Sequence, residues 1–284
     1  MPARNRLKLI RGRPQNLGDR LLRSDRAPEN GIIVKVKAPK QRSAKSRQSA
    51  GPKKKTRTPA QIPAYGKRPK TAAERKTRIA EILATLAKMY PDAVCALHHT
   101  SPWELLVATI LSAQCTDKRV NEVTPGLFAK YPTPVDFAAV APEVLAQDIR
   151  STGFFNNKAK SIVGAARKVV SEFGGQVPRT MEELLTIPGA ARKTANVVLG
   201  TAYNIATGIV VDTHVQRISA RLDFTKETDP VKIEQDLIKI VPQDQWIVFS
   251  HRVILHGRAL CVARNPKCVE CAIDPLCYAK DKTA

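Results

Sequence analysis

The chain has 284 residues, with 47 Lys and Arg against 25 Asp and Glu, which gives a formal net charge of +22 and a pI near 10.0. This excess of positive charge predicts a polyanionic partner such as nucleic acid. No run of about 18 apolar residues occurs in the sequence, so we expect no membrane-spanning helix.

The positive charge is concentrated at the start of the chain. Residues 1–70 hold 21 of the 47 basic residues but three acidic ones, which places +18 of the +22 in this segment. The segment is rich in Pro, Ser, Gly and Lys and has one aromatic residue, Tyr65. Such a composition buries too little apolar surface to offset chain entropy. We therefore predict a disordered basic N-terminal arm that binds DNA nonspecifically, with a merely solvated tail or a mitochondrial presequence as alternatives.

The rest of the chain has the pattern of helices. Thr71 and Glu74 form a capping box, and apolar residues at helical spacing follow it until Pro91. No alternating pattern of useful strand length occurs, so the predicted class is all-α. Further helices are expected at 103–113, 118–130, 142–150, 157–173, 181–186, 192–203, 214–222, 230–241 and 245–255.

One connection between helices carries a specific signal. In Leu185–Thr194 an amphipathic helix ends, Pro188-Gly189 forces a tight turn, and a second helix starts at once. This is a helix–hairpin–helix, whose turn presents backbone N–H groups to a phosphate without reading bases. An ordinary helical turn can have the same composition.

Four of the six cysteines lie within a 17-residue window, at Cys261, Cys268, Cys271 and Cys277. Thiolates this close together favour an iron–sulfur cluster or zinc. The spacing lacks the two separated pairs of a zinc finger, which favours a [4Fe–4S] cluster over zinc. A disulfide framework is less consistent with the sequence, because we expect no signal peptide and the remaining pair, Cys95 and Cys115, lies far away in the chain. Cys115 is interpreted as a packing residue.

Five motifs in register resemble the endonuclease III family of bifunctional DNA glycosylase/AP lyases. They are residues 111–117, 152–159, 187–199 and 211–215 and the cysteine loop. The resemblance covers about residues 72–280 and excludes the arm. It implies a two-domain all-α fold, with a six-helix domain at 96–206 that contains the hairpin. An iron–sulfur domain would combine 71–95 with 207–284.

The resemblance also implies the catalytic residues. Lys193 matches the nucleophile that forms a Schiff base with C1′ of the deoxyribose. Its place at a helix start, where the macrodipole disfavours an ammonium, suits that role, and burial would add to the effect. Asp212 matches the catalytic carboxylate, although a helix N-cap alone also explains an aspartate there.

Other residues match the family's positions for DNA contact. A flipped base leaves a gap that a polar side chain and an apolar wedge must fill, and these match Gln114 and Phe154. Ser112 and Asp117 match pocket-lining positions. The remaining expected DNA contacts come from the hairpin, the following helices and the cysteine loop, at Pro188, Gly189, Ala191, Arg192, His214, Arg264 and Lys267.

The hairpin departs from the family at Ala191, where glycine is common. A positive φ at this position would cost alanine about 1 kcal/mol. We expect instead that Ala191 begins the second helix, where alanine is harmless.

The expected function is therefore removal of oxidised pyrimidines from double-stranded DNA and cleavage of abasic sites, by a monomer that is cytoplasmic and nucleoid-associated, or nuclear or mitochondrial in a eukaryote. A pyrimidine-dimer glycosylase of the same fold is an alternative. Lys193, and the expectation of no recognition domain after Cys277, disfavour an adenine mismatch glycosylase. A noncatalytic redox-sensing DNA-binding module is the alternative from another class, and intact Lys193 and Asp212 argue against it.

Overall fold

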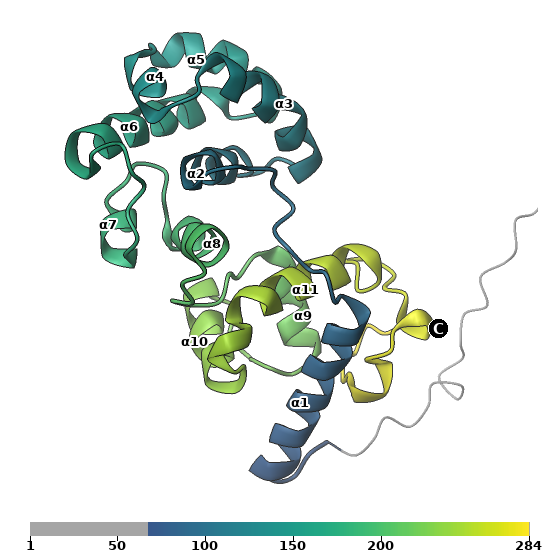
Figure 1. Cartoon of the computed structure of the whole chain (residues 1–284). Helices are drawn as coiled ribbons and strands as arrows, with labels where there is room; N and C mark the ends of the chain where they lie inside the picture. The colour runs from purple at the N-terminus through teal and green to yellow at the C-terminus, as the bar shows by residue number, and fades with distance from the viewer. Residues whose placement is uncertain (1–67, 284) are drawn as a thin grey trace, which may run out of the picture. The chain divides into compact units, whose positions relative to one another are not determined.

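A computed structural model describes residues 68–283 of the chain (Figure 1). All of the predicted arm except residues 68–70 lies outside this range. The described residues form helices joined by turns, with no strand among them, which confirms the all-α prediction. Within this range no helix is long and apolar enough to cross a membrane.

The described helices follow the predicted order. Their bounds are α1 Ala72–Met89, α2 Pro102–Leu111, α3 Asp117–Lys130, α4 Pro134–Ala139, α5 Pro142–Asp148, α6 Phe155–Phe173, α7 Met181–Leu185, α8 Arg192–Tyr203, α9 Thr213–Arg221, α10 Pro230–Ile240 and α11 Trp246–Ala259. Short 3-10 turns are η2 Arg150–Thr152, η3 Gln243–Gln245, η4 Cys268–Glu270 and η5 Asp274–Leu276. The predicted ends differ by about one turn at most, but α4 was not predicted.

The predicted capping box at the start of α1 is present. The Glu74 N–H donates to Thr71 Oγ1 over 3.1 Å, and the Thr71 N–H donates to the Glu74 carboxylate over 3.2 Å. Two amides of the helix start are thereby satisfied, which fixes where the helix begins.

Helices α2 to α8 enclose a first hydrophobic core. α4 and α5 pack against α6, while α2 and α7 pack against α8 (Figure 1). Aromatic contacts join Trp103 and Tyr131 to Phe137, with ring centroids 5.5 and 5.2 Å apart. The fully buried side chains of this core include Leu105, Leu106, Leu111, Phe137, Leu145, Ile149, Ile162 and Leu184.

A second hydrophobic core lies among α1, α9, α10 and α11 and the C-terminal turns. Its members include Ile82, Leu86, Phe224 and Phe249. Because α1 precedes the first core in the chain, the polypeptide leaves the second core after α1 and returns to it near Ile209. The exact domain boundaries near residues 96 and 206 stay a prediction.

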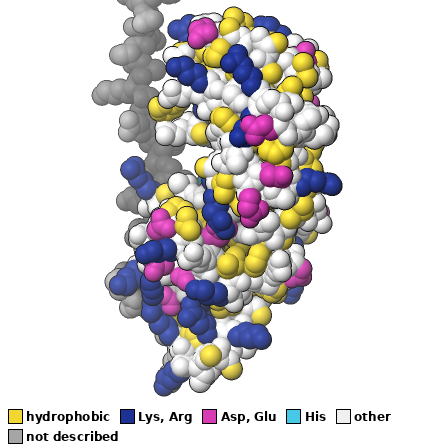
Figure 2. Space-filling view, turned by 90° about the vertical axis from the view of Figure 1, so that its left-hand side faces the viewer, with side chains coloured by type: hydrophobic (Ala, Val, Ile, Leu, Met, Phe, Trp, Pro, Cys, Tyr) yellow, Lys and Arg dark blue, Asp and Glu magenta, His cyan; other side chains and the backbone are white. Residues whose placement is uncertain are grey.

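The described surface carries both signs of charge. On the face shown in Figure 2, Lys and Arg side chains are interspersed with Asp and Glu side chains. This matches the sequence, in which residues 71–284 have 26 basic and 22 acidic residues.

Candidate active site

The hairpin between α7 and α8 turns at Gly189, whose φ is +82°. A Cβ atom added at Gly189 would lie 2.9 Å from Cβ of Ser161, so the backbone conformation and the packing both require glycine. Ala191 has a φ of −73° and is the N-cap of α8, so alanine fits without strain, as predicted. No side chain caps this helix start, which suits its first amides to an anion.

Lys193 is the second residue of α8, and its side chain is exposed. It lines a pocket together with residues of α2, α3 and α11. The pocket therefore lies between the first and second cores, and Lys193 lines it from the first core.

Asp212 lines the same pocket from the second core. It is half-buried and is the N-cap of α9, where its Oδ1 accepts the N–H groups of His214 (2.9 Å) and Val215 (2.8 Å). These two bonds confirm the capping role and hold the carboxylate in one orientation.

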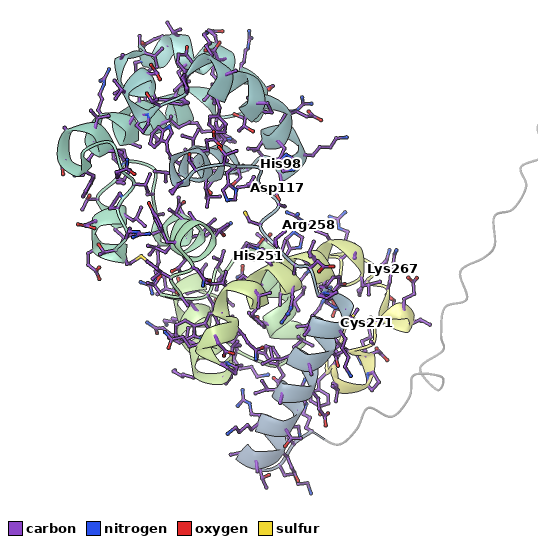
Figure 3. All side chains as sticks on the ribbon, in the orientation of Figure 1. His98, Asp117, His251, Arg258, Lys267 and Cys271 are labelled. Carbon is purple, nitrogen blue, oxygen red and sulfur yellow. The ribbon has the colours of Figure 1, made fainter. Side chains whose placement is uncertain are left out.

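Ser112 and Asp117 also line this pocket. The Asp117 carboxylate on α3 accepts from the Arg258 guanidinium on α11 over 2.6 Å, a contact that joins the two cores across the pocket (Figure 3). Ser112 Oγ instead donates to the carbonyl of Thr109 over 2.8 Å. The structure thus brings four of the predicted site residues to one pocket: Lys193, Asp212, Ser112 and Asp117.

α11 contributes a wall of the pocket that the sequence did not predict. Ile247, His251, Leu255 and Arg258 line it from this helix, and burial lowers the pKa of His251. Their spacing along the chain marks one helical face. The periodicity predicts that this face of α11 is in contact with the rest of the protein, but no local motif indicates that it lines a pocket.

A second contact between the cores lies beside Lys193. The Arg192 guanidinium donates to Glu234 through Nε (2.7 Å) and Nη2 (3.2 Å), and Asn196 Nδ2 donates to the same carboxylate over 2.9 Å. Glu234 belongs to α10 and is 4% exposed. The first turns of α8 are thereby fastened to the second core, and Arg192 has a protein partner. Its predicted contact with DNA stays a prediction.

Gln114 and Phe154 lie on a separate groove of the first core, together with Gly189 and Thr194. Both have left-handed backbones, with φ of 52° and 47°. Phe154 is 63% exposed, which is unusual for a large aromatic residue. Pro188 packs on α6, because a Cβ added at Gly164 would lie 3.3 Å from its ring.

The four cysteines of the C-terminal loop line a common pocket and are all half-buried. Cys261 Sγ accepts from Arg221 Nη1 over 3.2 Å, and Cys271 Sγ lies 3.7 Å from His256 Nε2. Among the described residues, no group of three or more His, Cys, Asp or Glu side chains converges on the position of a single metal ion.

The remaining predicted DNA contacts lie on the cysteine loop and in α9. Arg264 and Lys267 are exposed on the loop between Cys261 and Cys268. His214 is half-buried in the first turn of α9, with Nδ1 3.2 Å from Arg217 Nη2, and burial lowers its pKa.

Known proteins share this arrangement. Residues 107–243 match the family model described as HhH-GPD superfamily base excision DNA repair protein. Endonuclease III of Synechocystis sp. is 57% identical over 205 residues, which are 72% of this chain and 94% of the relative. The chain belongs to the endonuclease III family.

Two further comparisons agree with this membership. Endonuclease III of Bacillus subtilis is 46% identical over 70% of this chain and 91% of its own length. A solved structure of a trapped endonuclease III–DNA covalent intermediate superposes with a TM-score of 0.68, at 46% identity over 71% of this chain and 95% of that one.

Proposed function

We propose that this protein is a bifunctional DNA N-glycosylase and abasic-site lyase of base-excision repair. It removes oxidised or ring-saturated pyrimidines from double-stranded DNA and then cleaves the strand. Membership of the endonuclease III family supports the activity. The observation that carries the residue assignment is that Lys193 and Asp212 line one pocket from opposite cores.

Lys193 is the proposed nucleophile. Its neutral Nζ attacks C1′ of the damaged nucleotide, the glycosidic C1′–N bond breaks, and the base leaves with a proton. The sugar ring then opens: the C1′–O4′ bond breaks, O4′ takes a proton, and Nζ and C1′ become joined as a Schiff base, which makes a C2′ proton acidic. Loss of this proton expels the 3′ phosphate by β-elimination, and water then releases Lys193 and a 3′ unsaturated aldehyde.

Asp212 is the proposed catalytic carboxylate. As the C1′–N bond breaks, positive charge develops on the sugar, and a fixed negative charge beside it stabilises it. Its Oδ1 is held by two backbone amides, so the carboxylate needs no reorganisation during the reaction. It also accepts the proton that Lys193 must lose before attack.

The groove with Gln114 and Phe154 is the proposed DNA wedge. Extruding a base leaves its partner unpaired and the stack open. Phe154 offers an exposed ring for stacking, and Gln114 offers amide donors and an acceptor for the unpaired base. Gly189, the α8 start and the loop with Arg264 and Lys267 supply the proposed phosphate contacts.

The experiment that tests this function is borohydride trapping on two duplexes, one with thymine glycol and one with an abasic site. Wild-type protein is expected to form a covalent adduct with both, because borohydride reduces the Schiff base. Lys193→Ala is expected to form none, while Lys232→Ala, an exposed lysine of α10, behaves as wild type. An undiminished adduct with Lys193→Ala contradicts the assignment, and trapping on the abasic duplex alone reopens the pyrimidine-dimer specificity.

We also propose that Cys261, Cys268, Cys271 and Cys277 hold a [4Fe–4S] cluster. The four thiols line one pocket, and the sulfur of Cys261 accepts a hydrogen bond from Arg221. When bound, the cluster would shape the loop that carries Arg264 and Lys267, and no catalytic step would pass through it. Cys268→Ser is expected to lose iron and acid-labile sulfide, while Cys115→Ser keeps both. Full iron content in Cys268→Ser, or zinc in the wild type, contradicts the proposal.

The basic arm is proposed to strengthen nonspecific DNA binding at the nucleoid. Each phosphate neutralised by a lysine or arginine steepens the salt dependence of binding by about 0.9 in log–log slope. Deletion of residues 1–70 is expected to flatten this slope and to leave single-turnover chemistry unchanged. An unchanged slope contradicts a DNA contact by the arm.

A further inference from the structure

Lys158 is a buried lysine on α6, and the residue is 5% exposed. Its Nζ donates to two backbone carbonyls, those of Leu111 and Thr152, each over 2.8 Å. Burial lowers the pKa of Lys158. Leu111 is the last residue of α2, where the helix leaves carbonyls without intrahelical partners and a cation is favoured. The ammonium is therefore held by carbonyl oxygens of two different segments.

Each of these segments leads into one strained residue. Gln114 follows Leu111 by three positions and Phe154 follows Thr152 by two, and both have left-handed backbones. Such a conformation costs a residue other than glycine free energy, so it persists where neighbouring contacts fix it. Leu111 is the last residue of α2 and Thr152 is the last residue of η2, so Lys158 donates to the carbonyl at which each helical segment ends.

The same helix also supports the hairpin. Ser161 of α6 lies against Gly189, and Gly164 lies against Pro188. Lys158, Ser161, Gln114, Phe154 and Gly189 line one groove. α6 is therefore the common support for the two loops and the hairpin turn.

We propose that Lys158 is a positioning residue that fastens the Gln114 and Phe154 loops together as one rigid wedge. This inference rests on the proposed function, in which both side chains enter the DNA stack together. A wedge that is ordered before DNA binds loses little conformational entropy on insertion. Without the shared ammonium, each loop has to be ordered separately, and the cost falls on base extrusion rather than on the chemistry at Lys193.

Hydrogen exchange of the DNA-free protein tests the positioning directly. Lys158→Met keeps the length of the side chain and removes the donor. It is expected to raise amide exchange about tenfold in residues 113–116 and 153–155 and to leave α8 unchanged. Lys160→Met, an exposed lysine of the same helix, is the matched control and is expected to change neither segment. Equal protection of both loops in wild type and Lys158→Met overturns the inference.

Single-turnover rates test the consequence. On a duplex with a damaged base, Lys158→Met is expected to react at least about tenfold more slowly than wild type, since extrusion is impaired. On a single-stranded abasic oligonucleotide, which needs no wedge, the rates are expected to agree within about twofold. Equal slowing on both substrates indicates a general structural defect and overturns the inference.

Two further variants keep the test decisive. Lys158→Gln retains a neutral donor and is expected to give the same pattern to a smaller extent, which covers a failure of Lys158→Met to fold. Combined with Phe154→Ala, Lys158→Met is expected to slow the duplex reaction no further than the slower single variant, whereas additive losses overturn the coupling. A wild-type protein inactive on both substrates contradicts the proposed function, while the exchange result still decides whether Lys158 fixes the loops.

Discussion

The two cores contribute to the site in different ways. In the first core, the candidate DNA contacts Gln114, Phe154 and Gly189 all have positive φ, and their geometry depends on support from α6. In the second core, Asp212 is an ordinary helix N-cap with an extended backbone. Among these four residues, positive φ is therefore found at the proposed DNA contacts, while the proposed catalytic carboxylate comes from a helix start with an extended backbone. Substitutions in the two regions are therefore expected to fail in different ways.

The largest effect is expected at Asp212. Asparagine caps a helix about as well as aspartate, so Asp212→Asn removes the charge and keeps α9. Single-turnover excision of thymine glycol is expected to fall by about 10²–10³-fold, with a melting temperature close to that of wild type. If the melting temperature falls together with the rate, Asp212 acts only as the helix cap of α9.

Substitution of Gly189 is expected to lower the stability of the fold, which substitution of Asp212 leaves unchanged. Gly189→Ala puts a Cβ where Ser161 already packs, on a residue with φ of +82°. The left-handed conformation alone costs about 1–2 kcal/mol in stability, and the clash adds to this. Ala191→Gly is the matched control in the same turn and is expected to change stability by less than about 1 kcal/mol. Equal effects of the two substitutions in chemical denaturation contradict the geometry of the hairpin.

Glu234 tests the fastening of α8 to the second core. Glu234→Gln keeps the shape of the side chain and weakens its bonds to Arg192 and Asn196. Because the Arg192 side chain is 46% exposed, water solvates the unpaired cation, and the expected loss is about 1–2 kcal/mol. Denaturant titration measures it. A stability equal to wild type would show that the contact contributes nothing between the cores.

The smallest effect is expected at the other contact between the cores. Arg258→Ala removes the ion pair with Asp117, in which the Arg258 side chain is 43% exposed and the Asp117 side chain is 24% exposed. An ion pair this open to solvent contributes about 0–1 kcal/mol. The same titration compares Arg258→Ala with Glu234→Gln. A larger loss in Arg258→Ala would reverse the ranking of the two contacts.

Local signals in the sequence predicted most of the fold. The capping box at Thr71, the turn at Gly189 and the fit of Ala191 at a helix start all depend on neighbouring residues, and the structure has each of them. The short α4 was missed, although Thr133 and Asp136 form a capping box around Pro134. Six residues are too few to show a helical period, and Thr133-Pro134 is as typical of a turn as of a helix start.

Contacts between distant segments were not predicted. Asp117 and Arg258 are 141 positions apart, and Arg192 and Glu234 are 42 apart. Nothing in the residues around Glu234 distinguishes it from a solvent-exposed acid on an amphipathic helix. Lys158 likewise has the sequence context of a surface lysine, and its burial follows from how α2, η2 and α6 pack.

Peptide mapping of the borohydride-trapped adduct tests the central claim most directly. The adduct formed on an abasic duplex is digested with protease and nuclease, and mass spectrometry locates the modified lysine. A single modified site at Lys193 is the expected result, since this amine lies in the pocket with Asp212. An adduct on another lysine, such as Lys118 or Lys267, would contradict an active site assembled between the two cores.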